Sequence, residues 1–302
     1  MDNSAKELFQ EICDELDIKC TLLSKDWVYM LEKNGKIRFF VGYKSGINDY
    51  AVGKILDDKY ALYCVLRDKK LPVCEYNIVY NENIKGDYAV CCNSVSYVKE
   101  YFYQHHQDII MKPNNGTCGV DVFRVRDINQ LEMVYYQLTQ KHDSICISPF
   151  YLVQNEYRFI VLDGKVRVSF QKNKPVVYGD GVHSIKELLM AFNYDYFQNK
   201  LDNSIYDRVL DKNEEFEYSW KFNLSQGATS SLITDSNLYQ ELEKIAIKAA
   251  TSIGLRFGSV DIIVTEDKKA LVLEMNSGVM LYSKTKPLYR EVLLKLFDDK
   301  RD

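Results

Sequence analysis

Short apolar segments typical of strands alternate with amphipathic helical segments along the whole chain, and this alternation constrains the fold most. Residues 5–17 carry apolar side chains four positions apart on one helical face, and alternating stretches follow at 27–32 and 37–43. Asn34-Gly35 lies between these two stretches and predicts a tight hairpin. Helices and strands that alternate in small groups predict a mixed α+β protein built of several lobes.

The same periodicities predict the remaining elements. We expect further helices at 50–70, 94–107, 129–141, 184–192, 238–253 and 288–297. We expect further strands at 108–112, 120–126, 145–150, 156–162, 165–171, 258–265 and 270–274. The polar stretch 193–230 is expected to be irregular.

Composition excludes several classes of protein. The 302 residues are 46% hydrophobic and 27% charged, and 39 basic against 43 acidic residues give a net charge of −4. This balance is that of a globular protein and argues against a dedicated nucleic-acid binder, which usually carries a basic excess. No apolar stretch approaches the ~20 residues of a membrane helix, and the polar N-terminus does not resemble a secretory signal. We therefore expect a cytoplasmic protein without a membrane or nucleic-acid partner.

The cysteines and histidines do not suggest a zinc or thiol site. There are eight Cys and four His, and no two cysteines form a C-x-x-C pair. Buried or half-buried free thiols are the expected state of most of these cysteines.

A lysine and a glycine-containing loop follow one predicted strand. In MKPNNGTCGV (111–120), Lys112 ends the strand, and Gly116 lets backbone N–H groups approach phosphate oxygens without a Cβ in the way. The segment is not a P-loop, because G-x-x-x-x-G-K-[ST] is absent. On its own the segment favours an ordinary hairpin turn over a nucleotide loop.

Oxygen-bearing side chains gather in the last predicted strand pair. Asp261 lies in one strand, and Glu274 and Asn276 end the next, two residues apart and so on the same face. Hard oxygen ligands that leave room for phosphates are what Mg²⁺ selects. The alternative is a solvated polar strand end.

Two further segments carry polar groups that suit a ligand. Glu156 and Arg158 project to one face of a predicted hairpin strand, and Lys172 follows it. The acidic group suits sugar hydroxyls and the cations suit phosphate or carboxylate, although a cross-strand salt bridge explains the pair equally well. Residues 223–228 (NLSQGA) form a small, polar, turn-like segment.

The order and spacing of these features resemble the ATP-grasp superfamily of carboxylate–amine ligases. The likeness is greatest to the ATP-grasp portion of cyanophycin synthetase, with glutathione-forming and ribosomal-protein glutamate ligases nearby, and covers nearly the whole chain. It rests on five segments in the family's order, namely NDYAVGKILDDK (48–59), LRDKKLPV (66–73), the hinge strand 145–158, VVYGDGVHSIKELL (176–189) and NLSQGA (223–228).

The resemblance implies a role for each candidate residue. Asp261, Glu274 and Asn276 fall on the Mg²⁺ ligands, and Lys59 and Lys112 on the two phosphate-binding lysines. The implied nucleotide contacts are Lys59, Lys112, Asn115, Gly116, Gly119, Ser148, Phe150 and Glu156, with Glu156 on the ribose. The implied catalytic residues are Arg158, Lys172, Lys221 and Asn223. The chain departs from the family at Cys118, Asp121, Ser148, Lys172, Lys221 and residues 278–280.

The fold implied is the α+β ATP-grasp fold, in which two lobes grip ATP. Residues 1–50 would form a short N-terminal element for substrate, 51–145 the N-lobe with its phosphate loop, and 146–302 the C-lobe with the metal site. The large domains that flank this portion in cyanophycin synthetase have no counterpart in this sequence, so we do not expect its polymerisation reaction.

The activity implied is an ATP-dependent ligation of a carboxylate to an amine through an acyl phosphate, with release of ADP and phosphate. Two Mg²⁺ ions are expected, with Mn²⁺ as a substitute. The substrates are a small carboxylate and amine, or alternatively a peptide or protein whose side chains are joined by amide or ester links. A second alternative is a non-catalytic nucleotide-binding module. Homodimers are common among similar ligases, so a homodimer is the oligomer that the resemblance suggests.

Overall fold

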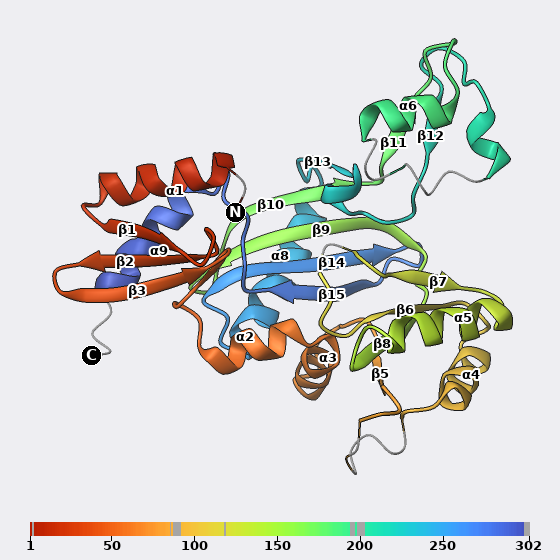
Figure 1. Cartoon of the computed structure of the whole chain (residues 1–302), viewed down its shortest axis with the longest axis horizontal. Coiled ribbons are helices and arrows are strands. Elements are labelled where there is room, and N and C mark those ends of the chain that lie inside the picture. The colour runs from red at the N-terminus through yellow and green to blue at the C-terminus, as the bar shows by residue number, and fades with distance from the viewer. Residues whose placement is uncertain are drawn as a thin grey trace. The chain divides into compact units, whose positions relative to one another are not determined.

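The computed structural model describes residues 1, 3–84, 86, 92–117, 119–193, 197 and 203–298. The chain divides into a larger compact unit, made of Met1–Ser169 and Ile233–Asp302, and a smaller one, Phe170–Leu232 (Figure 1). The division into functional segments 1–50, 51–145 and 146–302 stays a prediction. No helix of the described residues is long and apolar enough to cross a bilayer.

A four-stranded antiparallel sheet forms the N-terminal part of the larger unit. Its order is β1 (Lys19–Leu23), β2 (Val28–Lys33), β3 (Lys36–Val41) and β4 (Lys44–Ser45). Asn34 and Gly35 adopt φ of 51° and 75°, which confirms the predicted hairpin turn. Strand β1 is not among the predicted elements, because its five residues show no clear alternation.

Helices α1 (Asn3–Glu15) and α9 (Lys286–Asp298) cover one face of this sheet (Figure 1). The core between them is aromatic: the ring of Phe9 meets Tyr29 edge-to-face at 4.9 Å and Phe40 at 5.1 Å. All three side chains are at most 1% exposed. Phe9 and Phe40 also contact the ring of Tyr289 in α9, at 6.1 and 6.0 Å. Each such burial contributes roughly 1.5–3 kcal/mol, so the cluster anchors the N-terminal segment to α9.

The central sheet of the larger unit has the order β10-β9-β14-β15. Its strands are β9 (Val153–Leu162), the first part of β10 (Lys165–Asn173), β14 (Phe257–Thr265) and β15 (Ala270–Asn276). Helix α8 (Ser236–Ser252) packs against one face of β9, β14 and β15. Strand alternation directs apolar side chains such as Phe159, Val260 and Ile262 toward α8, and places Arg158 and Asp261 on the opposite face.

The predicted helix over 50–70 is two helices, α2 (Tyr50–Asp57) and α3 (Lys59–Asp68). Asp58 separates them with an extended backbone, and its carboxylate accepts a hydrogen bond from the backbone N–H of Ala61 at 2.8 Å. The apolar periodicity continues across the break, so it could not reveal this cap. The break makes Lys59 the first residue of α3, where its side chain projects from the start of the helix.

A second sheet of the larger unit has the order β5-β8-β6-β7. Its strands are β5 (Asn77–Tyr80), β6 (Ile109–Pro113), β7 (Phe123–Val125) and β8 (Ser144–Pro149), and α4 (Val95–Gln104) and α5 (Ile128–Thr139) pack on it. The prediction of a strand from residue 120 was wrong, because Gly119 and Asp121 adopt left-handed φ of 66° and 52° and make a turn before β7.

The smaller unit contains more regular structure than the sequence predicted. The end of β10 pairs with β13 (Thr229–Ser231), and β11 (Val176–Tyr178) pairs with β12 (Glu215–Glu217). It also holds α6 (Ile185–Phe192) and two 3-10 turns, η1 (Ser204–Asp207) and η2 (Leu224–Gln226). Helix α6 confirms the helix predicted at 184–192. The expectation of an irregular 193–230 was wrong for η1, β12, η2 and the start of β13, because segments of three or four residues are too short for periodicity to reveal.

Candidate active site

Charged side chains from three neighbouring strands meet on the face of the central sheet opposite α8. Arg158 of β9 lies directly across from Asp261 of β14, which lies across from Glu274 of β15. Asn276 is two residues beyond Glu274 and therefore shares its face. The structure thus brings together one predicted catalytic residue and the three predicted metal ligands.

Arg158 and Asp261 form a two-pronged ion pair. The guanidinium donates from Nε and Nη2 to the two carboxylate oxygens at 2.7 and 2.5 Å. Asp261 is fully buried, so its charge requires a partner. Burial alone would lower the pKa of Arg158, but the carboxylate of Asp261 outweighs burial and raises that pKa above its usual range. The guanidinium is therefore permanently charged beside the predicted metal ligands.

Glu274 and Asn276 supply hard oxygen atoms next to this pair. The Asn276 amide donates to Glu274 Oε1 at 3.3 Å, which brings the two side chains within contact. Two carboxylates and an amide oxygen on one sheet face fit Mg²⁺ in donor chemistry. The described residues contain no group of three or more His, Cys, Asp or Glu side chains that could hold a metal. The Asp261-Glu274-Asn276 set therefore stays a prediction.

The two predicted phosphate-binding lysines lie in the same unit, and the charge of Lys112 affects the pKa of Lys59. Burial is the main cause that lowers the pKa of Lys59, and the positive charge of Lys112 lowers it further, while Glu274 opposes both. Lys112 is 9% exposed, and no described carboxylate lies within 4.0 Å of either ammonium group. Two neighbouring cations that form no ion pair with a described carboxylate make a site that favours an anion.

The loop after β6 is held by hydrogen bonds from Lys59. The ammonium group of Lys59 donates to the carbonyl oxygens of Asn114 at 3.2 Å and Gly116 at 2.6 Å. The Asn114 side chain accepts from the backbone N–H of Tyr60 at 3.1 Å, and its buried Nδ2 has no hydrogen-bond partner among the described residues. Asn114 was not predicted, because nothing in the sequence distinguishes it from its neighbour Asn115.

The other predicted loop residues take different positions. Asn115 is exposed, Gly116 is half-buried, and Gly119 lies in the turn that follows. Adding a Cβ at Gly116 would place it 3.0 Å from the Pro113 side chain, so a larger residue would displace the loop. Cys118 lies outside the described residues.

The remaining predicted nucleotide contacts lie on β8, directly after it, and on β9. Ser148 is buried on β8, opposite Ile110 of β6, and Phe150 follows the strand. The Arg124 guanidinium lies 3.5 Å from the centre of the Phe150 ring, a cation–π contact. Glu156 is 8% exposed and shares its sheet face with Arg158, two residues along β9.

Lys172, Lys221 and Asn223 belong to the smaller unit. Lys172 is buried on β10 opposite Ser230, and the Lys221 ammonium lies 5.6 Å from the centre of a Trp220 ring. Asn223 caps the turn η2 by accepting from the backbone N–H of Ser225 at 3.0 Å. The catalytic roles of these three residues, together with Arg158, stay predictions.

Two cysteines lie close to the lysines without being suited to catalysis. Cys146 is opposite Lys112 in the sheet, and Cys74 lies in the adjoining hydrophobic cluster. Burial raises the pKa of each thiol to about 12. Both therefore stay protonated at neutral pH, as expected of structural cysteines.

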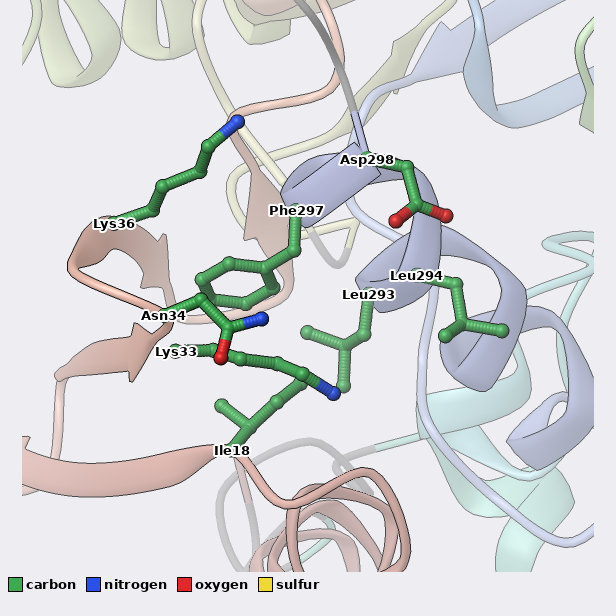
Figure 2. Close-up of a pocket in the computed structure, with 8 residues that line it drawn as sticks. All are labelled: Ile18, Lys33, Asn34, Lys36, Leu293, Leu294, Phe297 and Asp298. Atoms are coloured by element: carbon green, nitrogen blue, oxygen red, sulfur yellow. The ribbon is translucent and has the colours of Figure 1, made fainter.

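A pocket of about 110 Å³ lies elsewhere in the larger unit (Figure 2). Side chains of the β2–β3 hairpin and the end of α9 line it, with Phe297 and Leu293 beside Lys33. It contains none of the predicted site residues. Its small size and apolar floor give no support to a nucleotide site there.

Comparison with known proteins agrees with the resemblance seen in the sequence. A model of the RimK-like ATP-grasp domain matches residues 207–298, and a model of the prokaryotic glutathione synthetase ATP-grasp domain matches residues 80–173. The glutathione biosynthesis bifunctional protein GshAB of Listeria welshimeri is 23% identical over 253 residues, which are 74% of this chain and 32% of that protein. Cyanophycin synthetase of Trichormus variabilis is 27% identical over 201 residues, 56% of this chain and 22% of that protein.

Solved structures show the same fold. A bifunctional glutathione synthetase from Pasteurella multocida matches 97% of this chain and 43% of its own, with a TM-score of 0.56 and 17% identity. The chain spans about a third or less of the length of the curated relatives it matches. Two ATP-grasp domain models thus match separate parts of the chain, and its α+β architecture is that of the ATP-grasp fold.

Proposed function

We propose that the protein is an ATP-dependent ligase that joins a carboxylate to an amine and releases ADP and phosphate. One observation carries the proposal. The ammonium groups of Lys59 and Lys112 lie near enough for one to lower the pKa of the other, and no described carboxylate pairs with either. Keeping two like charges together in a partly buried place is unfavourable unless an anion completes the site, and a polyphosphate has the matching charge.

The chain's own residues explain how such a reaction would be assisted. Lys59 and Lys112 would bind phosphate oxygens and orient the nucleotide, and Glu156 would accept from ribose hydroxyls. Arg158, held by Asp261, would offset negative charge as it shifts from the nucleotide to the carboxylate substrate. Phosphoryl transfer depends mainly on such positioning and charge neutralisation.

The remaining assignments complete the proposed site. Asp261, Glu274 and Asn276 would hold Mg²⁺, which when bound would supply positive charge to offset that of the phosphates. The loop 112–121 would shield the reacting groups from water, which would otherwise hydrolyse an acyl phosphate. No cysteine nucleophile is needed, in agreement with the protonated state of Cys74 and Cys146.

The names of the relatives support this class of reaction. The matched proteins are named for the synthesis of glutathione and of cyanophycin, and both products contain amide bonds. The matched parts cover only 32% and 22% of those proteins, so their particular substrates do not follow for this chain. We therefore propose the reaction class and leave the acid and the amine to experiment.

The test is ADP release across a panel of carboxylates, amines and short peptides, with Mg²⁺ present. We expect release that needs both an acid and an amine, and its loss in Glu274→Ala. A matched control is Glu266→Ala, which removes an exposed carboxylate from the turn before β15. Peptide-dependent release would identify a peptide-modifying ligase. Tight ATP binding without turnover for any acceptor would contradict the proposal and support a non-catalytic module.

A further inference from the structure

A buried tyrosine that no sequence motif singled out holds the ammonium group of Lys112. Tyr76 is 3% exposed and lies directly before β5. Lys112 Nζ donates to Tyr76 Oη at 3.0 Å and lies 4.4 Å from the centre of its ring. Tyr76 Oη in turn donates to the carbonyl oxygen of Leu273 at 3.0 Å.

The direction of these two hydrogen bonds follows from chemistry. An ammonium group can only donate, so Tyr76 Oη must accept from Lys112. The single hydroxyl proton then goes to the Leu273 carbonyl, which can only accept. Burial raises the pKa of the Tyr76 phenol well above its usual value, so the hydroxyl stays neutral at any physiological pH.

A neutral acceptor has a particular consequence for the lysine. A carboxylate in this place would neutralise Lys112 and compete with any phosphate for it, whereas a hydroxyl orients the ammonium group and leaves its charge intact. No described carboxylate lies within 4.0 Å of Lys112 Nζ. Two of its three N–H donors are free of the tyrosine and can point to a ligand.

The backbone around Tyr76 is fixed to the strand that carries the predicted metal ligand. Val73 forms a parallel bridge with Val272, and the backbone N–H of Cys74 donates to the Val272 carbonyl at 2.9 Å. Leu273, the acceptor of the tyrosine hydroxyl, immediately precedes Glu274. One side chain thus links β6 of the second sheet to β15 of the central sheet.

We propose that Tyr76 is a positioning residue that aims the charged ammonium group of Lys112 at the nucleotide phosphates. This inference rests on the proposed function, because it assumes that Lys112 binds phosphate. It assigns to Tyr76 no contact with the nucleotide itself. Its effect should therefore depend on the phosphates of the ligand and on the presence of Lys112.

The test compares Tyr76→Phe with Tyr63→Phe by calorimetric titration with ATP and with adenosine. Tyr63 is a suitable control, because its ring meets that of Tyr76 edge-to-face at 6.4 Å and its side chain contacts Arg67 instead of Lys112. We expect Tyr76→Phe to weaken ATP binding about tenfold, equivalent to about 1.4 kcal/mol. Adenosine binding should change less than about twofold, as should both ligands in Tyr63→Phe.

A double-mutant cycle with Lys112→Met separates positioning from general loss of structure. If Tyr76 acts through Lys112, adding Tyr76→Phe to Lys112→Met should have no further effect on ATP binding. Equal weakening of ATP and adenosine, or an undiminished effect without Lys112, would overturn the inference. If the wild type binds ATP and Tyr76→Phe binds it equally well, the inference alone is overturned. If the wild type binds no ATP, the proposed function is overturned as well.

Discussion

Removing the carboxylate of Asp261 should destabilise the larger unit even without nucleotide. Asp261 is fully buried, and both of its oxygens accept from Arg158. The substitution Asp261→Ala leaves the guanidinium of Arg158 without its partner in a mostly buried place. We expect this unpaired charge, and not the lost volume of the carboxyl group, to dominate the effect.

The magnitude follows from the burial of the two groups. Loss of one partner from a buried ion pair costs about 3–5 kcal/mol. The Arg158 side chain keeps 27% of its surface exposed, so water can partly solvate the stranded charge. We therefore expect about 2–3 kcal/mol for Asp261→Ala, at or below the lower limit of that range. With a urea slope of about 1–3 kcal/mol per molar, the unfolding midpoint should fall by about 0.7–3 M.

The two tryptophans allow the larger unit to be followed by itself. The chain contains only Trp27 and Trp220, and these belong to the larger and the smaller unit respectively. In a Trp220→Phe background, urea unfolding followed by fluorescence reports on the larger unit. The titration should be carried out in EDTA, so that loss of a metal ligand does not contribute.

A double-mutant cycle gives the decisive comparison. Arg158→Met together with Asp261→Ala removes both charges. The free energy of unfolding lost in this double variant should therefore be smaller than the sum of the losses in the two single variants, by about 1 kcal/mol or more. Strictly additive effects would refute the reasoning, because they would mean that the stranded charge costs nothing.

Three further predictions concern the lysine, its helix cap and the cysteines. Because the pKa of Lys59 is lowered, ATP should bind with full affinity below that pKa and lose affinity as the pH rises through it, at a pH below the ordinary lysine value of 10.5. Lys59→Arg should remove this loss of affinity in a pH series of binding titrations. Asp58→Ala should cost about 1 kcal/mol and weaken ATP binding, whereas the cap variant Asp49→Ala should cost a similar amount without affecting ATP, as denaturation and titration can show. Cys74 and Cys146 should resist thiol reagents at pH 8 in the native protein and react in urea, because burial raises the pKa of both to about 12; mapping by mass spectrometry would reveal early modification if this is wrong.

The sequence predicted the parts of the fold that follow from side-chain alternation. The β2–β3 hairpin and the pair of strands carrying Asp261 and Glu274 have the expected faces, since a period of two determines which residues point together. The break at Asp58 was missed, because a capping aspartate inside a continuous apolar pattern does not interrupt the periodicity.

The sequence predicted candidate site residues but not the contacts that support them. Motif order predicted Lys59, Lys112, Arg158 and Glu274 as site residues, and all four lie in the larger unit, while their roles stay predictions. Tyr76 could not be found, because it is one of 23 tyrosines and its role arises from contacts between residues far apart in the chain. Such contacts are decided by tertiary packing and leave no local pattern.

Titration of the wild-type protein with Mg²⁺ and ATP, beside the variant Lys59→Met with Lys112→Met, tests the central claim most directly. If the two lysines form the phosphate site of an ATP-dependent ligase, the wild type should bind ATP and the double variant should bind it at least about 100-fold more weakly, equivalent to about 2.8 kcal/mol. The folded double variant should keep the far-ultraviolet circular dichroism of the wild type. ATP binding of equal strength in both proteins would contradict the account.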